Sequence, residues 1–171
     1  MQIILLGYMA SGKSSIGKKL AKNLSLNFLD LDDYISEQEK MTIPEIFKVK
    51  GEIYFRKIEH LYLKEILKKE EDFLLALGGG TPCYANNMNE INKTDAISVY
   101  LNGNTNTMIA RAIKKKAKRP IIASLEDEKI PEFVAKHLFE RRPFYEQAKI
   151  TIKIDDKSKK EVALELTEML G

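Results

Sequence analysis

The sequence is poor in several features that would define a class of protein, and each shortage excludes something. With one cysteine, Cys83, the chain cannot form an internal disulfide. Its two histidines do not stand at metal-ligand spacing from each other or from that cysteine, which disfavours a Cys/His metal site. No apolar run is long enough to span a bilayer or to serve as a signal sequence. We therefore expect a protein of the reducing cytoplasm with no membrane partner.

An excess of charge of one sign is missing too. The 28 Lys and Arg residues nearly balance the 25 Asp and Glu residues, giving a net charge of +3. Apart from the run KKKAKR at 114–119 the basic residues are scattered, so we expect no nucleic-acid partner. The 171 residues contain no repeat or Gly/Ser-rich linker and are too few for two ordinary domains. A single domain over residues 1–171 is expected.

What the chain does have is a series of short apolar runs separated by helical patterns. Runs of strand length stand at 3–6, 27–31, 73–77, 96–101 and 150–154. Helical spacing covers 14–24 and 52–69, and Thr42 to Glu45 has the form of a capping box with proline near the helix start. Apolar strands alternating with helices predict an α/β fold with a parallel sheet covered on both faces.

The first strand runs into GYMASGKSS at 7–15. This stretch matches G-x-x-x-x-G-K-[ST], with Gly7, Gly12, Lys13 and Ser14 in the fixed places. Backbone N–H groups of such a loop and the following helix point at phosphate oxygens. We expect Lys13 to face solvent and reach the terminal phosphates, and the Ser14 hydroxyl to bind Mg²⁺. An ordinary βα turn is the alternative, but the full pattern between strand and helix favours a purine nucleoside triphosphate.

A second nucleotide-binding motif matches in its residues but not in its position relative to the predicted strands. Residues 92–95 read NKTD, the N-K-x-D pattern with which GTPases read guanine. In GTPases that pattern follows a strand, whereas here it precedes one, and no aspartate has glycine three residues later to complete D-x-x-G. The segment is predicted to be a helix-to-strand turn, and a GTP switch is disfavoured.

Two aspartates at the end of the second predicted strand offer a candidate acid–base pair. Asp30 and Asp32 are two apart in FLDLD, so in an extended chain both carboxylates would share one face. One could orient Mg²⁺ through water while the other accepts a proton from an attacking hydroxyl. The alternative is that Asp32 or Asp33 only caps the next helix. The residues alone leave both interpretations open.

Further along, Arg56 and Glu59 are three apart on a predicted helix. Such a pair is often a surface ion pair of small value. Gly78, Gly79 and Gly80 follow the third strand and expose backbone where a ligand can approach closely.

Together these motifs resemble the shikimate kinase family. GYMASGKSSIG, FLDLDDYI, GEIYFRKIE, the GGG, a lone RPII and RRPFYEQA occur in that family's order and intervals, from Gln2 to about Leu170. The resemblance implies a three-layer α/β/α sandwich of the P-loop kinase type, with a five-stranded parallel sheet and a lid at about 114–130. It also implies a cytoplasmic, monomeric transferase of aromatic amino-acid biosynthesis, which phosphorylates the 3-hydroxyl of shikimate with ATP and Mg²⁺.

The resemblance also assigns roles to residues. Asp32, Lys13 and Arg119 are implied to be catalytic, with Asp32 as the base. ATP would be bound by Gly7, Ala10, Ser11, Gly12, Lys13, Ser14, Ser15, Arg111 and Arg119. Shikimate would be bound by Asp32, Arg56, Gly78, Gly79, Gly80 and Arg141. Mg²⁺ would be held by Ser14 and, through water, by Asp30.

Several details depart from the family or are ambiguous. Alanine stands at Ala10, where the family often has glycine, and we expect it to be tolerated if its φ is negative. Arg141 and Arg142 form a doublet, and the pattern R-x-P-x-Y favours Arg141. Arg111 could lie against adenine or at a plain surface position. The basic lid could be merely solvated, whereas the resemblance places Arg119 on the transferring phosphoryl group.

Two rival functions remain to be weighed. One is another small-metabolite kinase of the same fold, such as a gluconate or nucleoside-monophosphate kinase. A nucleotide acceptor would demand a base-binding pocket and several phosphate-facing arginines, and a neutral sugar would not explain the paired Arg56 and Arg141. A non-catalytic nucleotide switch would have no need of Asp32 as a base beside Lys13. Cys83 could lie near substrate or fill a small apolar space, and His60 and His137 are expected to have no special role.

Overall fold

The computed structural model describes residues 1–171, with side chains described at 1–119 and 121–171. Five parallel strands form one sheet in the order β2-β3-β1-β4-β5. The strands are β1 (Gln2–Leu6), β2 (Asn27–Asp30), β3 (Phe73–Ala76), β4 (Ile97–Asn102) and β5 (Ile150–Lys153). The expected five-stranded parallel sheet is confirmed.

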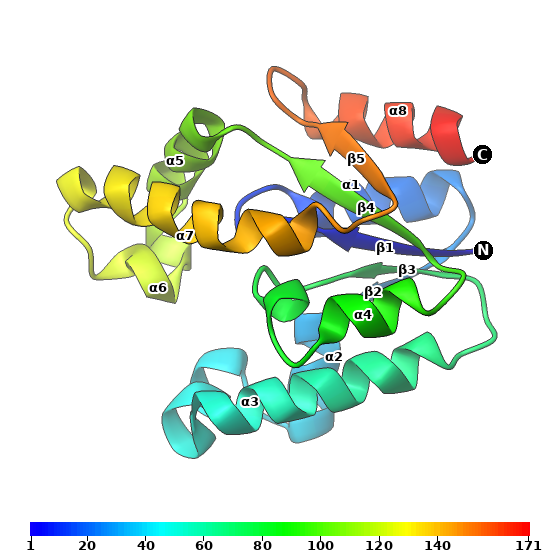
Figure 1. The fold of residues 1–171 in the computed structure, drawn as a ribbon, viewed down its shortest axis with the longest axis horizontal. Helices are drawn as coiled ribbons and strands as arrows, with labels where there is room; N and C mark the ends of the chain where they lie inside the picture. The colour runs from blue at the N-terminus through cyan, green and yellow to red at the C-terminus, as the bar shows by residue number, and fades with distance from the viewer.

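Helices cover both faces of this sheet. They are α1 (Lys13–Asn23), α2 (Leu31–Glu39), α3 (Ile43–Leu67), α4 (Asn87–Asn92), α5 (Thr105–Lys114), α6 (Pro120–Ala123), α7 (Ile130–Tyr145) and α8 (Lys159–Leu170), with 3₁₀ turns η1 (Thr81–Cys83), η2 (Lys116–Lys118) and η3 (Asp127–Lys129). Figure 1 shows α1 and α8 side by side on one face and α3 and α4 on the other. Helices α5 and α6 lie beyond the ends toward which the strand arrows point.

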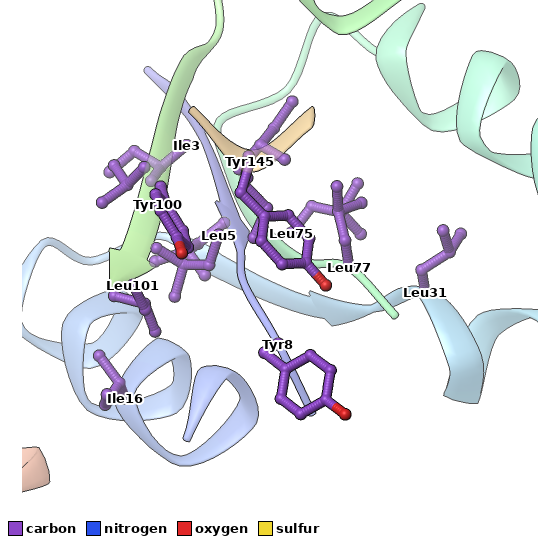
Figure 2. Close-up of a cluster of buried hydrophobic side chains, with 14 of the residues drawn as sticks. Ile3, Leu5, Tyr8, Ile16, Leu31, Leu75, Leu77, Tyr100, Leu101 and Tyr145 are labelled. Atoms are coloured by element: carbon purple, nitrogen blue, oxygen red, sulfur yellow. The ribbon is translucent and has the colours of Figure 1, made fainter. Parts of the chain in front are cut away.

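The central strand explains why its sequence is apolar without alternation. Ile3 to Leu6 are all fully buried, because β1 has a strand on each side and helices above and below. Figure 2 shows Ile3 and Leu5 of β1 among core side chains from β3, β4 and α7. The Tyr100 and Tyr145 rings, whose centroids are 5.2 Å apart, join β4 to α7 in this core.

The strand order places a crevice where the first loop begins. β1 lies between β3 and β4, so the connections on either side of it lead to opposite halves of the sheet. A parallel sheet binds ligands at such a switch point, beyond the carboxyl ends of its strands. The loop at 7–12 leaves β1 at this point.

The strand boundaries agree with the predicted runs to within one residue, and one helix is longer than predicted. The helical pattern at 52–69 belongs to a longer helix, α3, which begins at the predicted capping box of Thr42 and Glu45 and kinks at Gly51, where φ is 86°. The second strand ends at Asp30 rather than at residue 31, since α2 starts at Leu31. The NKTD segment does join α4 to β4 as a turn, as predicted.

The segment predicted to be a polar lid is partly apolar and partly helical. It contains η2, α6 and η3, and Ile122 and Ile130 are fully buried. None of the helices in the described part of the chain has the length and apolar character needed to cross a membrane.

Candidate active site

The loop at 7–15 is held together by its own lysine. Lys13 is only 9% exposed, and its Nζ donates to the carbonyl oxygens of Gly7 at 2.8 Å and Tyr8 at 3.0 Å. The expectation that Lys13 faces solvent is therefore wrong. Burial, followed by the charge of Arg119, lowers the pKa of Lys13 from 10.5 to about 7. The ammonium is poised to gain a partner when phosphate enters.

The backbone conformation of Ala10 contradicts the condition expected for an alanine at this position of the loop. Ala10 has a φ of 64°, in the left-handed region, so the negative φ on which its tolerance was expected to depend is not found. A non-glycine residue in this conformation costs roughly 1 kcal/mol or more. The hydrogen bonds of Lys13 and the connection to β1 hold the loop in this conformation despite that cost.

The aspartate pair is arranged differently from the extended strand that its spacing suggested. Asp30 is the N-cap of α2, and its Oδ1 accepts the backbone N–H of Asp32 at 3.0 Å and of Asp33 at 3.4 Å. Asp30 thus does the capping that was considered for Asp32 or Asp33. Its other oxygen accepts from the Ser14 hydroxyl at 2.6 Å. Asp32 stands in the first helical turn and is free to face the crevice.

Asp32 has the electrostatics of a base. Burial, and then the negative charges of Asp30 and Glu59, raise its pKa from 3.8 to about 6. A carboxyl with this pKa is ionised at neutral pH and is a better proton acceptor than an exposed aspartate.

Each glycine of the GGG segment leaves room for one functional side chain. A Cβ at Gly78 would lie 3.1 Å from Asp32 Oδ1, and one at Gly80 would lie 2.7 Å from Arg56 Nη2. At Gly79 it would lie 3.2 Å from the Met9 backbone N and 3.5 Å from Arg141 Nη1. The sequence predicted close approach at this segment, and the structure shows that the side chains of Asp32, Arg56 and Arg141 and the backbone of Met9 lie against it.

A buried carboxylate fixes the orientation of the Arg56 guanidinium. Glu59 is 1% exposed; it accepts from Arg56 Nη1 at 2.9 Å and from the Thr81 hydroxyl at 2.9 Å. The Tyr84 ring stacks on the guanidinium at 3.9 Å. The interpretation of Arg56 and Glu59 as a weak surface pair is wrong, because η1 covers the carboxylate.

The two arginines of the doublet point to different places. Arg141 is 9% exposed, lines the crevice and makes no ion pair with any described carboxylate. Arg142 does not line it and donates to the Thr105 hydroxyl at 3.3 Å. Tyr145, from the same R-x-P-x-Y pattern, donates its hydroxyl to the Gly79 carbonyl at 2.6 Å and so ties α7 to the glycine segment.

The crevice consists of two joined cavities. The larger, of about 820 Å³, is lined by Arg56, Gly80 and Arg141 among apolar groups such as Phe55 and Phe133. The smaller, of about 150 Å³, is lined by loop residues including Lys13, Ser14 and Ser15. Both are lined by the same five residues: Met9, Asp32, Gly78, Gly79 and Arg119. Asp32 and Arg119 therefore stand where the contents of the two cavities would meet.

Sequence reasoning missed two further lysines and a histidine. Lys115 and Lys159 line the smaller cavity, although Lys115 resembled its neighbours in the basic run and Lys159 belongs to no motif. His137 lines the larger cavity, and its Nδ1 is 2.9 Å from the Tyr8 hydroxyl. Burial, and then Arg141, lower the pKa of His137 to about 4, so it is neutral near pH 7. His137, for which no special role was expected, thus forms part of the crevice wall.

Two other residues lie near the site without lining it. Arg111 Nη1 donates to the Ser11 carbonyl at 3.3 Å, so it contacts the phosphate loop. Cys83 is partly buried, and burial raises its pKa to about 11, which keeps it a thiol. It packs against the core, as a filler would.

The acidic groups of the site suit magnesium held mainly by a nucleotide. No cluster of three or more His, Cys, Asp or Glu capable of holding a metal occurs within the described residues. Mg²⁺ commonly binds one or two protein oxygens together with phosphates and waters. The bonded oxygens of Ser14 and Asp30 at the smaller cavity fit that requirement.

Comparison with known proteins agrees with the geometry. The family model for shikimate kinase (SKI) matches residues 9–171. The shikimate kinase of Flavobacterium psychrophilum is 47% identical over 99% of this chain and 98% of its own, and that of Flavobacterium johnsoniae is 43% identical over 99% of both.

Solved structures give the same result. The crystal structure of shikimate kinase from Bacteroides thetaiotaomicron has a TM-score of 0.89 at 35% identity and covers 99% of this chain and 98% of its own. Shikimate kinase from Acinetobacter baumannii in complex with shikimate has a TM-score of 0.86 at 31% identity, covering 99% and 92%. The chain belongs to the shikimate kinase family.

Proposed function

We propose that the protein transfers the γ-phosphoryl group of ATP to the 3-hydroxyl of shikimate, giving shikimate 3-phosphate and ADP. The observation that carries the proposal is the meeting of two cavities at Asp32 and Arg119, one lined by a phosphate-binding loop and the other by Arg141. Family membership supports the same reaction.

Arg141 and Arg56 are proposed to hold the shikimate carboxylate, in unequal ways. Arg56 already has Glu59 as a counter-ion, whereas Arg141 is buried without one among the described residues. Arg141 would therefore supply the net charge, and Arg56 would add hydrogen bonds from an orientation that Glu59 and Tyr84 fix. Two planar guanidiniums suit the planar carboxylate of the substrate.

Asp32 is proposed to accept the proton of the substrate hydroxyl as its oxygen attacks the γ-phosphorus. The bond from phosphorus to the bridging oxygen of ADP breaks, and the proton stays on Asp32 until it is released. Arg119 would donate to the equatorial oxygens of the transferring group. Its Nε is buried and has no hydrogen-bond partner among the described residues, which leaves it free for a ligand.

The loop and its neighbours are proposed to hold the nucleotide. Lys13 would reach the terminal phosphates, Ser14 would bind Mg²⁺ directly, and Asp30 would bind it through water. Bound Mg²⁺ would neutralise part of the phosphate charge. The segment 114–130 would close over the site as a lid and exclude water, within one kinase domain of residues 1–171 acting as a monomer.

An ADP-release assay coupled to NADH oxidation tests the proposal. ATP and Mg²⁺ would be supplied with shikimate, quinate, gluconate or a nucleoside monophosphate in turn. Shikimate should give a turnover at least about 100-fold above the others, because the reaction needs the hydroxyl placed at Asp32 while Arg141 and Arg56 hold the carboxylate, and a different acceptor skeleton shifts that hydroxyl. Comparable turnover with gluconate or a nucleotide acceptor would contradict the assignment. Lys13→Ala, checked for folding by circular dichroism, gives the background rate.

A further inference from the structure

The mouth of the phosphate cavity carries two lysines that the nucleotide loop does not supply. Lys115 is the C-cap of α5, and Lys159 is the first residue of α8. Both line the smaller cavity together with Lys13 and Ser15. Two elements distant in the chain thus bring cations to one wall.

Lys159 is held over the loop by the fold. Its Nζ donates to the Ser15 hydroxyl at 3.4 Å. Its aliphatic stem covers Gly12, since a Cβ at that glycine would be 3.4 Å from Lys159 Cε. Helices α1 and α8 pack side by side, so this contact follows from their packing (Figure 1). The ammonium is therefore placed against the start of α1, where P-loops receive phosphate.

Neither lysine has a counter-ion within the described part of the chain. Burial, and then the charge of Lys159, lower the pKa of Lys115, and Arg119 and Arg111 add to the effect. Lys159 also stands at the N-terminus of a helix, the end at which a cation is unfavourable. Asp30 and Asp32 line the same cavity but form no ion pair with either lysine. Neighbouring cations without an ion pair to a described carboxylate are explained when an anion occupies the cavity.

We propose that Lys159 and Lys115 bind the non-transferred phosphates of a nucleoside di- or triphosphate. This inference rests on the proposed nucleotide site. Lys13 reaches the terminal phosphates in such loops, whereas the N–H groups at the start of the helix hold the α- and β-phosphates. Lys159 contacts Ser15 and Gly12, on the helix side of the loop. Because its contact is present before and during transfer, it contributes to affinity rather than to turnover.

Calorimetric titration of Lys159→Met and Lys115→Met tests the proposal. Methionine keeps the apolar stem and removes the charge, and Lys160→Met, an exposed neighbour on α8, is the matched control. ADP and a non-hydrolysable ATP analogue would be titrated in the presence of Mg²⁺. We expect Lys159→Met to weaken both about tenfold and Lys115→Met to weaken both about threefold, with the control within about twofold of wild type. At saturating ATP, kcat should change less than about threefold.

Two results would overturn the proposal. ADP affinity within twofold of wild type in Lys159→Met would show that the lysine does not bind phosphate. Weaker binding of the ATP analogue alone would place the contact on the transferred phosphoryl group. Because the titrations contain no shikimate, their result does not depend on the acceptor. An absence of shikimate turnover in the wild type would refute the proposed function, and the ADP titrations would still decide the role of these lysines.

Discussion

Replacing Asp32 by asparagine should make the protein more stable and nearly inactive. Burial raises the pKa of this carboxyl in the folded protein from 3.8 to about 6, with Asp30 and Glu59 adding to the effect. Between these two pH values the folded state binds a proton that the unfolded state releases, so stability falls as pH rises through this window. Above it, the ionised carboxylate costs about 3 kcal/mol at roughly 1.4 kcal/mol per pKa unit.

Asparagine has similar shape and no charge, so it should recover that cost. At pH 8, Asp32→Asn should be about 3 kcal/mol more stable than wild type, and at pH 5 the gain should shrink to about 1.5 kcal/mol because wild-type Asp32 is then largely protonated. Turnover should fall by about 100-fold or more, since the amide cannot accept the hydroxyl proton.

A competing effect has the opposite sign and allows a clear decision. Asp32 lies in the first turn of α2, where a negative charge is favoured by about 0.3–1 kcal/mol. If that effect dominated, the asparagine variant would be less stable than wild type at pH 8. Urea denaturation at pH 5 and pH 8 measures the difference, and Glu37→Gln, on the exposed face of the same helix, is the control. A loss of stability at pH 8, or an equal gain at both pH values, would refute the reasoning.

Arg141→Lys should raise the KM for shikimate about 10- to 100-fold and leave the KM for ATP nearly unchanged, because lysine loses the two-pronged fit to a carboxylate. Arg142→Lys should change neither KM, and greater sensitivity at Arg142 in steady-state kinetics would reverse the assignment. Arg119→Ala should lower kcat roughly 100- to 1000-fold with calorimetric shikimate affinity retained, whereas Lys116→Ala, whose ammonium already pairs with a carboxylate at 3.0 Å, should stay within a few-fold. Equal mild losses at both positions would indicate diffuse charge. Nucleotide binding at pH 8 should take up about one proton, because burial, followed by Arg119, holds the pKa of Lys13 near 7 until phosphate arrives. Calorimetry in buffers of different ionisation enthalpy measures this uptake, which should vanish in Lys13→Met.

The parts of the site that could be predicted from sequence are those coded within a few residues. The loop at 7–15 carries its glycines, lysine and serine in one segment between a strand and a helix, and the backbone geometry of that unit follows from it. The inner strands β1, β3 and β4 could be predicted because they are largely apolar without alternation, which occurs when both faces of a sheet are covered. The edge strand β5 instead alternates isoleucine with exposed Thr151 and Lys153.

Burial of charge could not be predicted, because it depends on segments that meet only in the fold. Glu59 is a buried anchor rather than a surface partner since Thr81, which lies 22 residues away, covers it. The contact between Lys159 and Ser15 joins residues 144 positions apart. In the same way the GGG segment signalled close approach, but only the packing of α3 and α7 shows that Arg56 and Arg141 fill that space.

The unneutralised charges of the crevice connect its stability to its ligands. Lys13, Arg119 and Arg141 repel one another strongly enough to contribute to the low pKa of Lys13. Both proposed substrates are anions, and each would place negative charge beside one part of this group. Bound anions would favour the protonated form of Lys13 and reduce the repulsion among these three cations. The repulsion present in the unliganded fold would therefore contribute to ligand affinity. Such a site favours anionic ligands in both cavities at once, which a kinase acting on a carboxylate-bearing alcohol requires.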